Sequence, residues 1–216
     1  MPAYVRPMRR KVMAEILDAL PADDPEAVAS RRDLRRINAL MGNFRWMRRA
    51  MRALPGDRRG GLVEIGAGDG GFLEMVRGDF ETVTGVDLAP RPATLDERIG
   101  WRQGDVSEGL GGGDVLAANL FLHHFEDGRL RELGAAAREF RAVCFSEPWR
   151  SRLALAEGYA MCPFVTRVTR HDMLVSIRAG FVRGELPDLL GLGAGWEVRE
   201  EVSLLGAYRL LAWRAR

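Results

Sequence analysis

The stretch "LVEIGAGDGGF", residues 62–72, decides the fold of this chain. It is an apolar run that ends in glycines, with the carboxylate of Glu64 set inside the run. A short apolar run predicts a buried strand. The glycines predict a tight turn whose bare backbone a ligand can approach at the start of the following helix. A strand, a glycine turn and a helix in this order are typical of doubly wound α/β folds.

The pattern after residue 60 extends this prediction to a whole domain. Short β-type runs alternate with helical ones, which indicates a mostly parallel sheet with crossover helices. We predict strands near 62–66, 82–87, 98–102, 114–119 and 141–146, and helices near 70–78, 90–97 and 126–139.

The first 58 residues have a different, helical pattern. Apolar residues recur at three-to-four spacing in two stretches, one over residues 8–20 and one over residues 30–54. "LPADDPEAVAS" separates them, and its two prolines predict a break. We therefore expect a helical N-terminal cap or lid over residues 1–58, followed by an α/β domain over 59–216 with a lid insertion at about 150–195.

Composition limits the class of protein. The 216 residues suit one domain, and 47% hydrophobic residues can bury a substantial core. No stretch is long and apolar enough to cross a bilayer, and no apolar segment follows "MPAYVRPMRR" as in a signal peptide, so we expect a cytoplasmic protein. Cys144 and Cys162 have no metal-type spacing, and we expect both to be buried thiols.

Two ligands fit the glycine turn. Gly66, Gly68 and Gly71 satisfy GxGxxG, the dinucleotide fingerprint, whereas Glu64, Gly66, Gly68 and Gly70 satisfy ExGxGxG. A dinucleotide brings a pyrophosphate to this turn, which a nearby carboxylate would repel. S-adenosylmethionine (SAM) brings an ammonium, to which a carboxylate is complementary. Glu64 therefore favours SAM, and a nicotinamide-dependent oxidoreductase is the alternative.

Polar residues follow the later strands. Asp87 lies 21 residues after Gly66, where an acidic side chain can accept hydrogen bonds from ribose hydroxyls. "WRQGDV" places Asp105 after the third strand, and "DVLAANLFLHHFED" ends the fourth with Asn119, His123 and His124. These residues indicate a nucleoside ligand at the carboxyl edge of the sheet.

Over about residues 60–150 the chain resembles the class I SAM-dependent methyltransferases. The match runs through "LVEIGAGDGG", "GVDLAP", "RQGDV", "ANLFLHHFED" and "CFSEPW" in that family's order. The resemblance implies a Rossmann-like, seven-stranded sheet whose last strand is antiparallel, with "WEVREEVSLLGAYRLLAWRAR" as the final hairpin. The cofactor-binding residues that it implies are Glu64, Gly66, Ala67 and Gly68 for the methionine part, Asp87 and Leu88 for the ribose, Asp105 and Val106 for the adenine, and Asn119.

Within that family the chain is similar to bacterial small-molecule methyltransferases of quinone and polyketide pathways. This likeness implies a small, aromatic or polyketide-derived acceptor and methylation at oxygen. A hydroxyl acceptor needs a base, and a histidine can serve at neutral pH. We favour His124 slightly over His123, with His171 and Glu147 as alternatives. We expect no metal, because the oxygen ligands after the strands form no recognisable set.

The helix over residues 30–54 has an arginine-rich face. We expect it to pack as a lid over the active site. Alternatively, this helix contacts a membrane surface through Phe44, Trp46 and the arginines. The protein would then be a SAM-binding, membrane-associated module without turnover. No recognised nucleic-acid module is present, so we expect no nucleic-acid partner. Apolar residues expected to line the acceptor pocket are Met161, Phe164, Met173 and Phe181.

Overall fold

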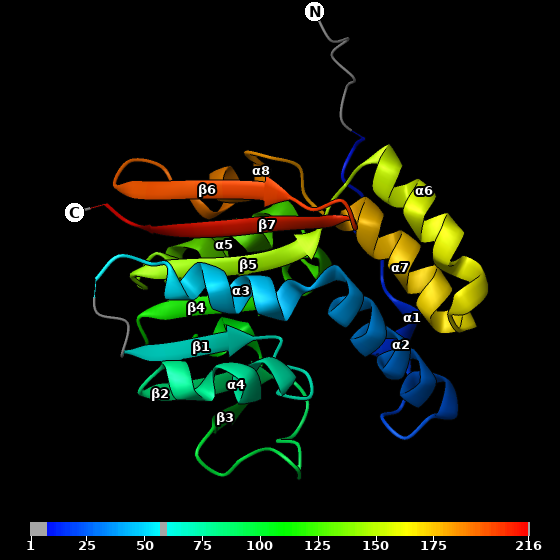
Figure 1. Ribbon diagram of the computed structural model, residues 1–216, viewed down its shortest axis with the longest axis horizontal. Coiled ribbons are helices and arrows are strands. Elements are labelled where there is room, and N and C mark those ends of the chain that lie inside the picture. The colour runs from blue at the N-terminus through cyan, green and yellow to red at the C-terminus, as the bar shows by residue number, and fades with distance from the viewer. Residues whose placement is uncertain (1–7, 57–59, 216) are drawn as a thin grey trace, which may run out of the picture.

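The computed structural model describes residues 8–56 and 60–215, and its centre is one seven-stranded sheet (Figure 1). The strands are β1 (Gly61–Ile65), β2 (Thr82–Asp87), β3 (Gly100–Gln103), β4 (Val115–Asn119), β5 (Ala142–Pro148), β6 (Trp196–Val202) and β7 (Ala207–Arg214), in the order β3-β2-β1-β4-β5-β7-β6. Strand β7 is antiparallel to its neighbours β5 and β6, and the pairs from β3 to β5 are parallel. The predicted Rossmann-like sheet is confirmed.

Helices cover both faces of this sheet. The α-helices of the described residues are α1 (Ile16–Ala19), α2 (Pro25–Met41), α3 (Asn43–Arg52), α4 (Gly71–Val76), α5 (Asp127–Ala137), α6 (Arg152–Met161), α7 (Arg167–Ala179) and α8 (Glu185–Leu190). One apolar cluster packs α3 and α4 against the sheet, and a second packs α5 and α8 against the opposite face. All seven residues of β5 are buried, as expected for a central strand covered on both faces.

The N-terminal helices differ from the prediction in two ways. Residues 8–15 are not helical, because their polar groups bond to α7 instead: the amide of Lys11 donates to the carbonyl of Arg178 (3.1 Å). The second helix begins earlier, at Pro25, where the carboxylate of Asp24 caps the amide of Glu26 at 2.7 Å. It then breaks at Gly42, whose φ of +67° separates α2 from α3.

The predicted helix over 90–97 is wrong. The segment forms turns, because Pro90 and Pro92 lack the amide hydrogens that a helix needs. The guanidinium of Arg91 holds these turns through the carbonyls of Leu95 (3.2 Å) and Ile99 (2.5 Å).

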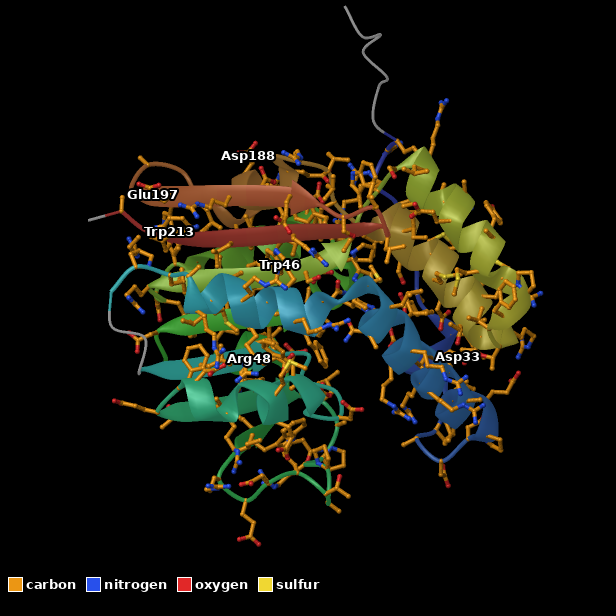
Figure 2. The ribbon with its side chains drawn as sticks, viewed as in Figure 1. Asp33, Trp46, Arg48, Asp188, Glu197 and Trp213 are labelled. Atoms are coloured by element: carbon orange, nitrogen blue, oxygen red, sulfur yellow. The ribbon has the colours of Figure 1, made fainter. Side chains whose placement is uncertain are left out.

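Helix α3 lies flat on the sheet (Figure 2). The guanidinium groups of Arg48 and Arg52 both donate to Asp79, at 2.6 Å and 2.5 Å. Trp46 lies under the guanidinium of Arg209 at 5.3 Å, and the Phe44 ring contacts that of Phe72 at a centroid distance of 5.2 Å. The two aromatic residues that a membrane contact would use are therefore half-buried and pack against the core. Within the described residues, no helix is long and apolar enough to span a membrane.

Helices α1, α2, α6 and α7 gather beyond the carboxyl ends of the parallel strands (Figure 1). Buried Asp33 of α2 joins two of them, because its carboxylate accepts from the amide of Thr166 at the start of α7 (2.8 Å). Helix α8, which falls in the predicted lid insertion, instead joins the core through Leu186 and Leu190. The predicted boundary at residues 58–59 lies outside the described residues.

Candidate functional site

The glycine turn follows β1 and leads into α4. Gly66, Gly68 and Gly70 all have φ between 57° and 73°, a region that favours glycine. A Cβ on Gly66 would lie 2.3 Å from the Phe121 ring. The turn after β1 can therefore approach the loop after β4 only because residue 66 has no side chain. A Cβ on Gly68 would meet nothing within 4 Å, which leaves its backbone open to a ligand.

Glu64 lies under this turn with one carboxylate oxygen unpaired. The residue is 2% exposed, and its Oε2 has no hydrogen-bond partner. Burial, and then the nearby charges of Asp69 and Asp87, raise the pKa of Glu64 well above its usual value. A buried carboxylate oxygen without a partner is costly in the absence of a ligand. The position fits a cation, such as the ammonium of an amino acid.

Asp87 ends β2 directly beside the turn. Its Oδ2 accepts from the amide of Gly68 and its Oδ1 from that of Ala89, both at 2.8 Å. These bonds fix the carboxylate, and each oxygen keeps a lone pair for a ligand hydroxyl. Leu88, predicted beside it, is 71% exposed.

The two residues predicted around the adenine lie after β3. The carboxylate of Asp105 caps η2 (Val106–Glu108) by accepting from the amide of Ser107 at 2.6 Å, which lowers the pKa of Asp105. Val106 is 9% exposed and belongs to the core. Asn119 ends β4, and its buried Oδ1 is unpaired like the Glu64 oxygen. The turn, Asp87, Asp105 and Asn119 all follow strand ends at one edge of the sheet.

His123 is enclosed by carboxylates in η3 (Leu122–His124), after β4. It is 3% exposed, with Nδ1 2.8 Å from Glu147 Oε2 and Nε2 3.3 Å from Glu15 Oε1. Burial alone would lower the pKa of His123, but hydrogen bonds to Glu147 and Glu15 outweigh it and raise the pKa to about 9.

Glu147 holds η3 in place. The side chain is fully buried, and its Oε1 accepts from the amides of Phe121 (3.1 Å) and Leu122 (2.9 Å). Its other oxygen binds His123. Because both oxygens bind this loop, Glu147 holds η3 and the His123 ring in place, and its role as a base toward an acceptor stays a prediction.

The other two histidines are more accessible. His124 is 27% exposed at its side chain, with Nδ1 3.4 Å from Asp18 Oδ2, and its ring lies 4.3 Å from that of His123. His171 is 43% exposed and contacts Asp172 at 2.9 Å. The structure therefore brings His123 and His124 together, whereas His171 lies in α7 beside Asp172, whose carboxylate also accepts from the amides of Ile16 and Leu17.

The extended segment over residues 8–15 packs beside His123, and the sequence did not predict this placement. The guanidinium of Arg10 donates to the carbonyls of Phe125 (2.8 Å) and His123 (3.3 Å), which are more than 110 residues away. Glu15 accepts from the hydroxyl of Ser176 in α7 and contacts His123. The helical periodicity of residues 8–20 gave no signal for these contacts.

The predicted acceptor-lining residues do not form one set. Phe181 is fully buried and packs on Tyr208 in the core, so it lines no pocket. Phe164 is 77% exposed, while Met161 and Met173 are half-buried. Cys144 is buried as expected, whereas Cys162 is only half-buried.

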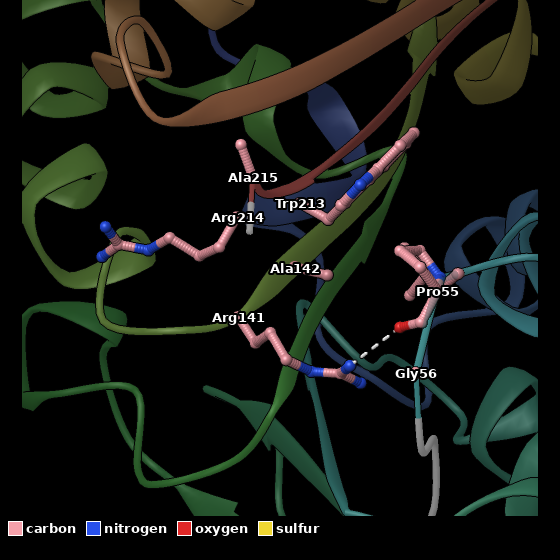
Figure 3. Close-up of a pocket in the computed structure, with 8 residues that line it drawn as sticks. Pro55, Gly56, Arg141, Ala142, Trp213, Arg214 and Ala215 are labelled. Atoms are coloured by element: carbon pink, nitrogen blue, oxygen red, sulfur yellow. Dashed lines mark hydrogen bonds between the residues drawn. The ribbon is translucent and has the colours of Figure 1, made fainter.

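A cavity of about 290 Å³ lies at the opposite edge of the sheet (Figure 3). It lies between Leu54 and Pro55 at the end of α3 and Ala142 and Trp213 of the sheet, and Arg141 donates to the carbonyl of Pro55 there at 3.1 Å. Because β5 begins here and β7 ends here, this cavity faces away from the glycine turn and the histidines.

The sheet order, the antiparallel β7 and the glycine turn define a Rossmann-like fold of the methyltransferase type. No family model and no curated protein matches the sequence. Among solved structures, the plantazolicin methyltransferase BpumL in complex with S-adenosylhomocysteine (SAH) aligns with a TM-score of 0.69 and 11% identity, covering 90% of this chain and 92% of that chain.

Two other solved structures share the fold. The pyocyanin biosynthetic protein PhzM aligns with a TM-score of 0.60 and 19% identity, over 94% of this chain and 62% of that one. Human N-acetylserotonin methyltransferase in complex with SAM aligns with a TM-score of 0.55 and 16% identity, over 92% and 61%. At these identities the likeness establishes the fold.

Proposed function

We propose that this chain is a SAM-dependent methyltransferase that acts on a small acceptor. The observation that carries the proposal is the unpaired, buried carboxylate oxygen of Glu64 beneath an open glycine turn. Glu64, Asp69 and Asp87 place three carboxylates around this turn, close enough that the latter two raise the pKa of Glu64. Such a site attracts an ammonium and repels a pyrophosphate, so it favours SAM over a dinucleotide.

The residues at the strand ends bind different parts of SAM. The turn at Gly66 and Gly68 leaves room for the methionine part, and Glu64 receives its ammonium. Asp87, already oriented by two amides, accepts from the ribose hydroxyls. Asp105 and Val106 flank the adenine, and Asn119 closes the pocket.

The proposed reaction is O-methylation of an aromatic or polyketide-derived molecule. SAM supplies a methyl group activated by its sulfonium. The protein orients the acceptor hydroxyl for in-line attack, and a histidine takes the proton that the oxygen releases. His124 fits this role better than His123, because both ring nitrogens of His123 face carboxylates and its side chain is 4% exposed. The neighbours support a small acceptor: one is complexed with a desmethylPZN analogue and another is an N-acetylserotonin methyltransferase.

Thermal unfolding with SAM, SAH, NADH and NADPH tests the proposal. A ligand at about 100 times its dissociation constant adds about 2.7 kcal/mol, or roughly 5 to 11 °C for a domain of this size. We expect this shift with SAM and SAH only, and a much smaller one in Asp87→Ala. A shift with the nicotinamides alone would refute the proposal and indicate an oxidoreductase.

A further inference from the structure

Three side chains with metal-binding atoms meet beside the loop after β4. Glu15, His123 and His124 each offer one ligand atom, and these atoms all lie within 4.8 Å of one another. Glu15 and His123 are nearly buried, with side chains 9% and 4% exposed, whereas His124 opens toward solvent at 27%. This arrangement of two imidazoles, one carboxylate and an open side is common in metal sites.

The distance between Glu15 and His123 fits a shared ion. Their facing atoms, Oε1 and Nε2, are 3.3 Å apart. A direct charge-assisted N–H···O bond is typically about 2.7–2.9 Å long, which is the length of the other contact of His123, to Glu147, at 2.8 Å. Two ligands about 2.0–2.2 Å from a tetrahedral zinc ion are separated by about 3.3–3.5 Å.

Outer partners orient two of the three ligands, as they do in established metal sites. Glu147 is fully buried and binds His123 Nδ1, which directs Nε2 toward Glu15. The hydroxyl of Ser176 donates to Glu15 Oε1, the same oxygen that faces His123. Asp18, close to His124, adds a further negative charge. The guanidinium of Arg10 is bound to backbone carbonyls and to the carboxylate of Asp127.

We propose that Glu15, His123 and His124 form a binding site for one divalent transition-metal ion of the zinc type. Imidazole ligands select Zn²⁺ or Co²⁺ over Mg²⁺ and Ca²⁺, which prefer oxygen. The ion displaces a proton from His123 Nε2, and water fills the fourth position.

The bound ion connects the N-terminal segment to the loop after β4. Glu15 belongs to the first described segment and the histidines to η3, so the ion joins residues 108 positions apart. On the proposed function His124 is the base, so an ion bound there blocks methyl transfer and is not its cofactor. The metal site itself stands on this geometry and not on the proposed function, so metal binding is measured without any adenosyl ligand.

Isothermal titration calorimetry of the untagged, chelator-treated chain with ZnCl₂, CoCl₂ and MgCl₂ tests the site. We expect one Zn²⁺ or Co²⁺ per chain, with the visible absorption of tetrahedral Co²⁺, and no binding of Mg²⁺. Glu15→Gln and His124→Gln should each weaken Zn²⁺ binding more than about 100-fold, and Ser176→Ala, which removes an outer partner, by about 10-fold or more.

The chain contains three histidines and two cysteines, so a control for other zinc-binding side chains needs few substitutions. The double variant His171→Gln with Cys162→Ser removes the other accessible soft ligands and should bind Zn²⁺ like the unmodified chain. Circular dichroism verifies that each variant is folded, and Ser176→Ala remains informative where Glu15→Gln unfolds. Absence of Zn²⁺ binding, binding that survives both ligand substitutions, or binding lost in the control would overturn the inference.

Discussion

Replacing Glu64 by glutamine should have opposite effects on ligand affinity and on the stability of the free protein. The amide keeps the size of the side chain and removes its charge. A hydrogen bond to a charged group contributes about 1.5–3 kcal/mol, so the affinity for SAH should fall about 10- to 150-fold. At an SAH concentration of about 100 times the original dissociation constant, the stabilisation then falls from about 2.7 to between about 1.4 and 0.3 kcal/mol.

The free protein should become more stable by the same substitution. The pKa of Glu64 is raised above its ordinary 4.5, chiefly by burial, so the unfolded chain ionises more readily than the folded one. This residue therefore costs stability increasingly as the pH rises above about 4.5, and glutamine removes that cost. Each kcal/mol corresponds to roughly 2–4 °C in Tm for a domain of this size.

Calorimetric melting with and without SAH, from pH 4 to 8, measures both effects. Glu81→Gln is the matched control, because Glu81 is exposed in the same domain and its replacement should leave both quantities unchanged. If Glu64→Gln bound SAH as before and melted at a lower temperature, Glu64 would be a structural residue, and the assignment of the ammonium site would be incorrect.

Three other predictions concern the site and its support. His124→Gln should lower turnover at least 100-fold in a methyl-transfer assay with any accepted phenol while leaving the SAH dissociation constant unchanged; unaltered turnover would remove it as the base. Gly66→Ala should abolish SAH binding, because its Cβ would enter the Phe121 ring, whereas Gly68→Ala should cost only about 1 kcal/mol of backbone strain in a denaturant titration. An equal loss of folding stability in the two variants would contradict this. Asp79→Asn should destabilise the fold by about 1 kcal/mol at neutral pH. Burial alone would raise the pKa of Asp79, but hydrogen bonds from Arg48 and Arg52 outweigh it and lower the pKa, so that this stabilisation is present above pH 3.8 and lost on acidification. A deficit that persisted in acid would argue against the ion pair.

The sheet was predictable because its signals are local. Apolar runs and glycine turns define β1, β2, β4 and β5 within a residue or two of their observed bounds. The Glu64 and glycine positions at the turn also follow from a single short stretch. The segment 90–97 was predicted as a helix, but Pro90 and Pro92 remove helical donors, and the segment forms turns.

The surroundings of the histidines could not be predicted in the same way. The sequence places His123 and His124 after β4, but it contains no pattern that pairs them with Glu15 or Glu147. Residues 8–15 have a helical spacing of apolar side chains and are nevertheless extended, because tertiary hydrogen bonds to α7 replace helical ones. Contacts between residues more than 100 positions apart depend on the completed fold.

The N-terminal segment also has a consequence for how the chain folds during synthesis. Arg10 donates to the carbonyl of Ala179, 169 residues later, and the amide of Ile16 to Asp172, 156 residues later. A ribosome therefore makes this segment well before these partners. Contacts of such sequence separation form slowly because a long loop must close before they form. The N-terminal segment, although made before its partners, should therefore be among the last parts of the described chain to acquire protection from amide hydrogen exchange during refolding.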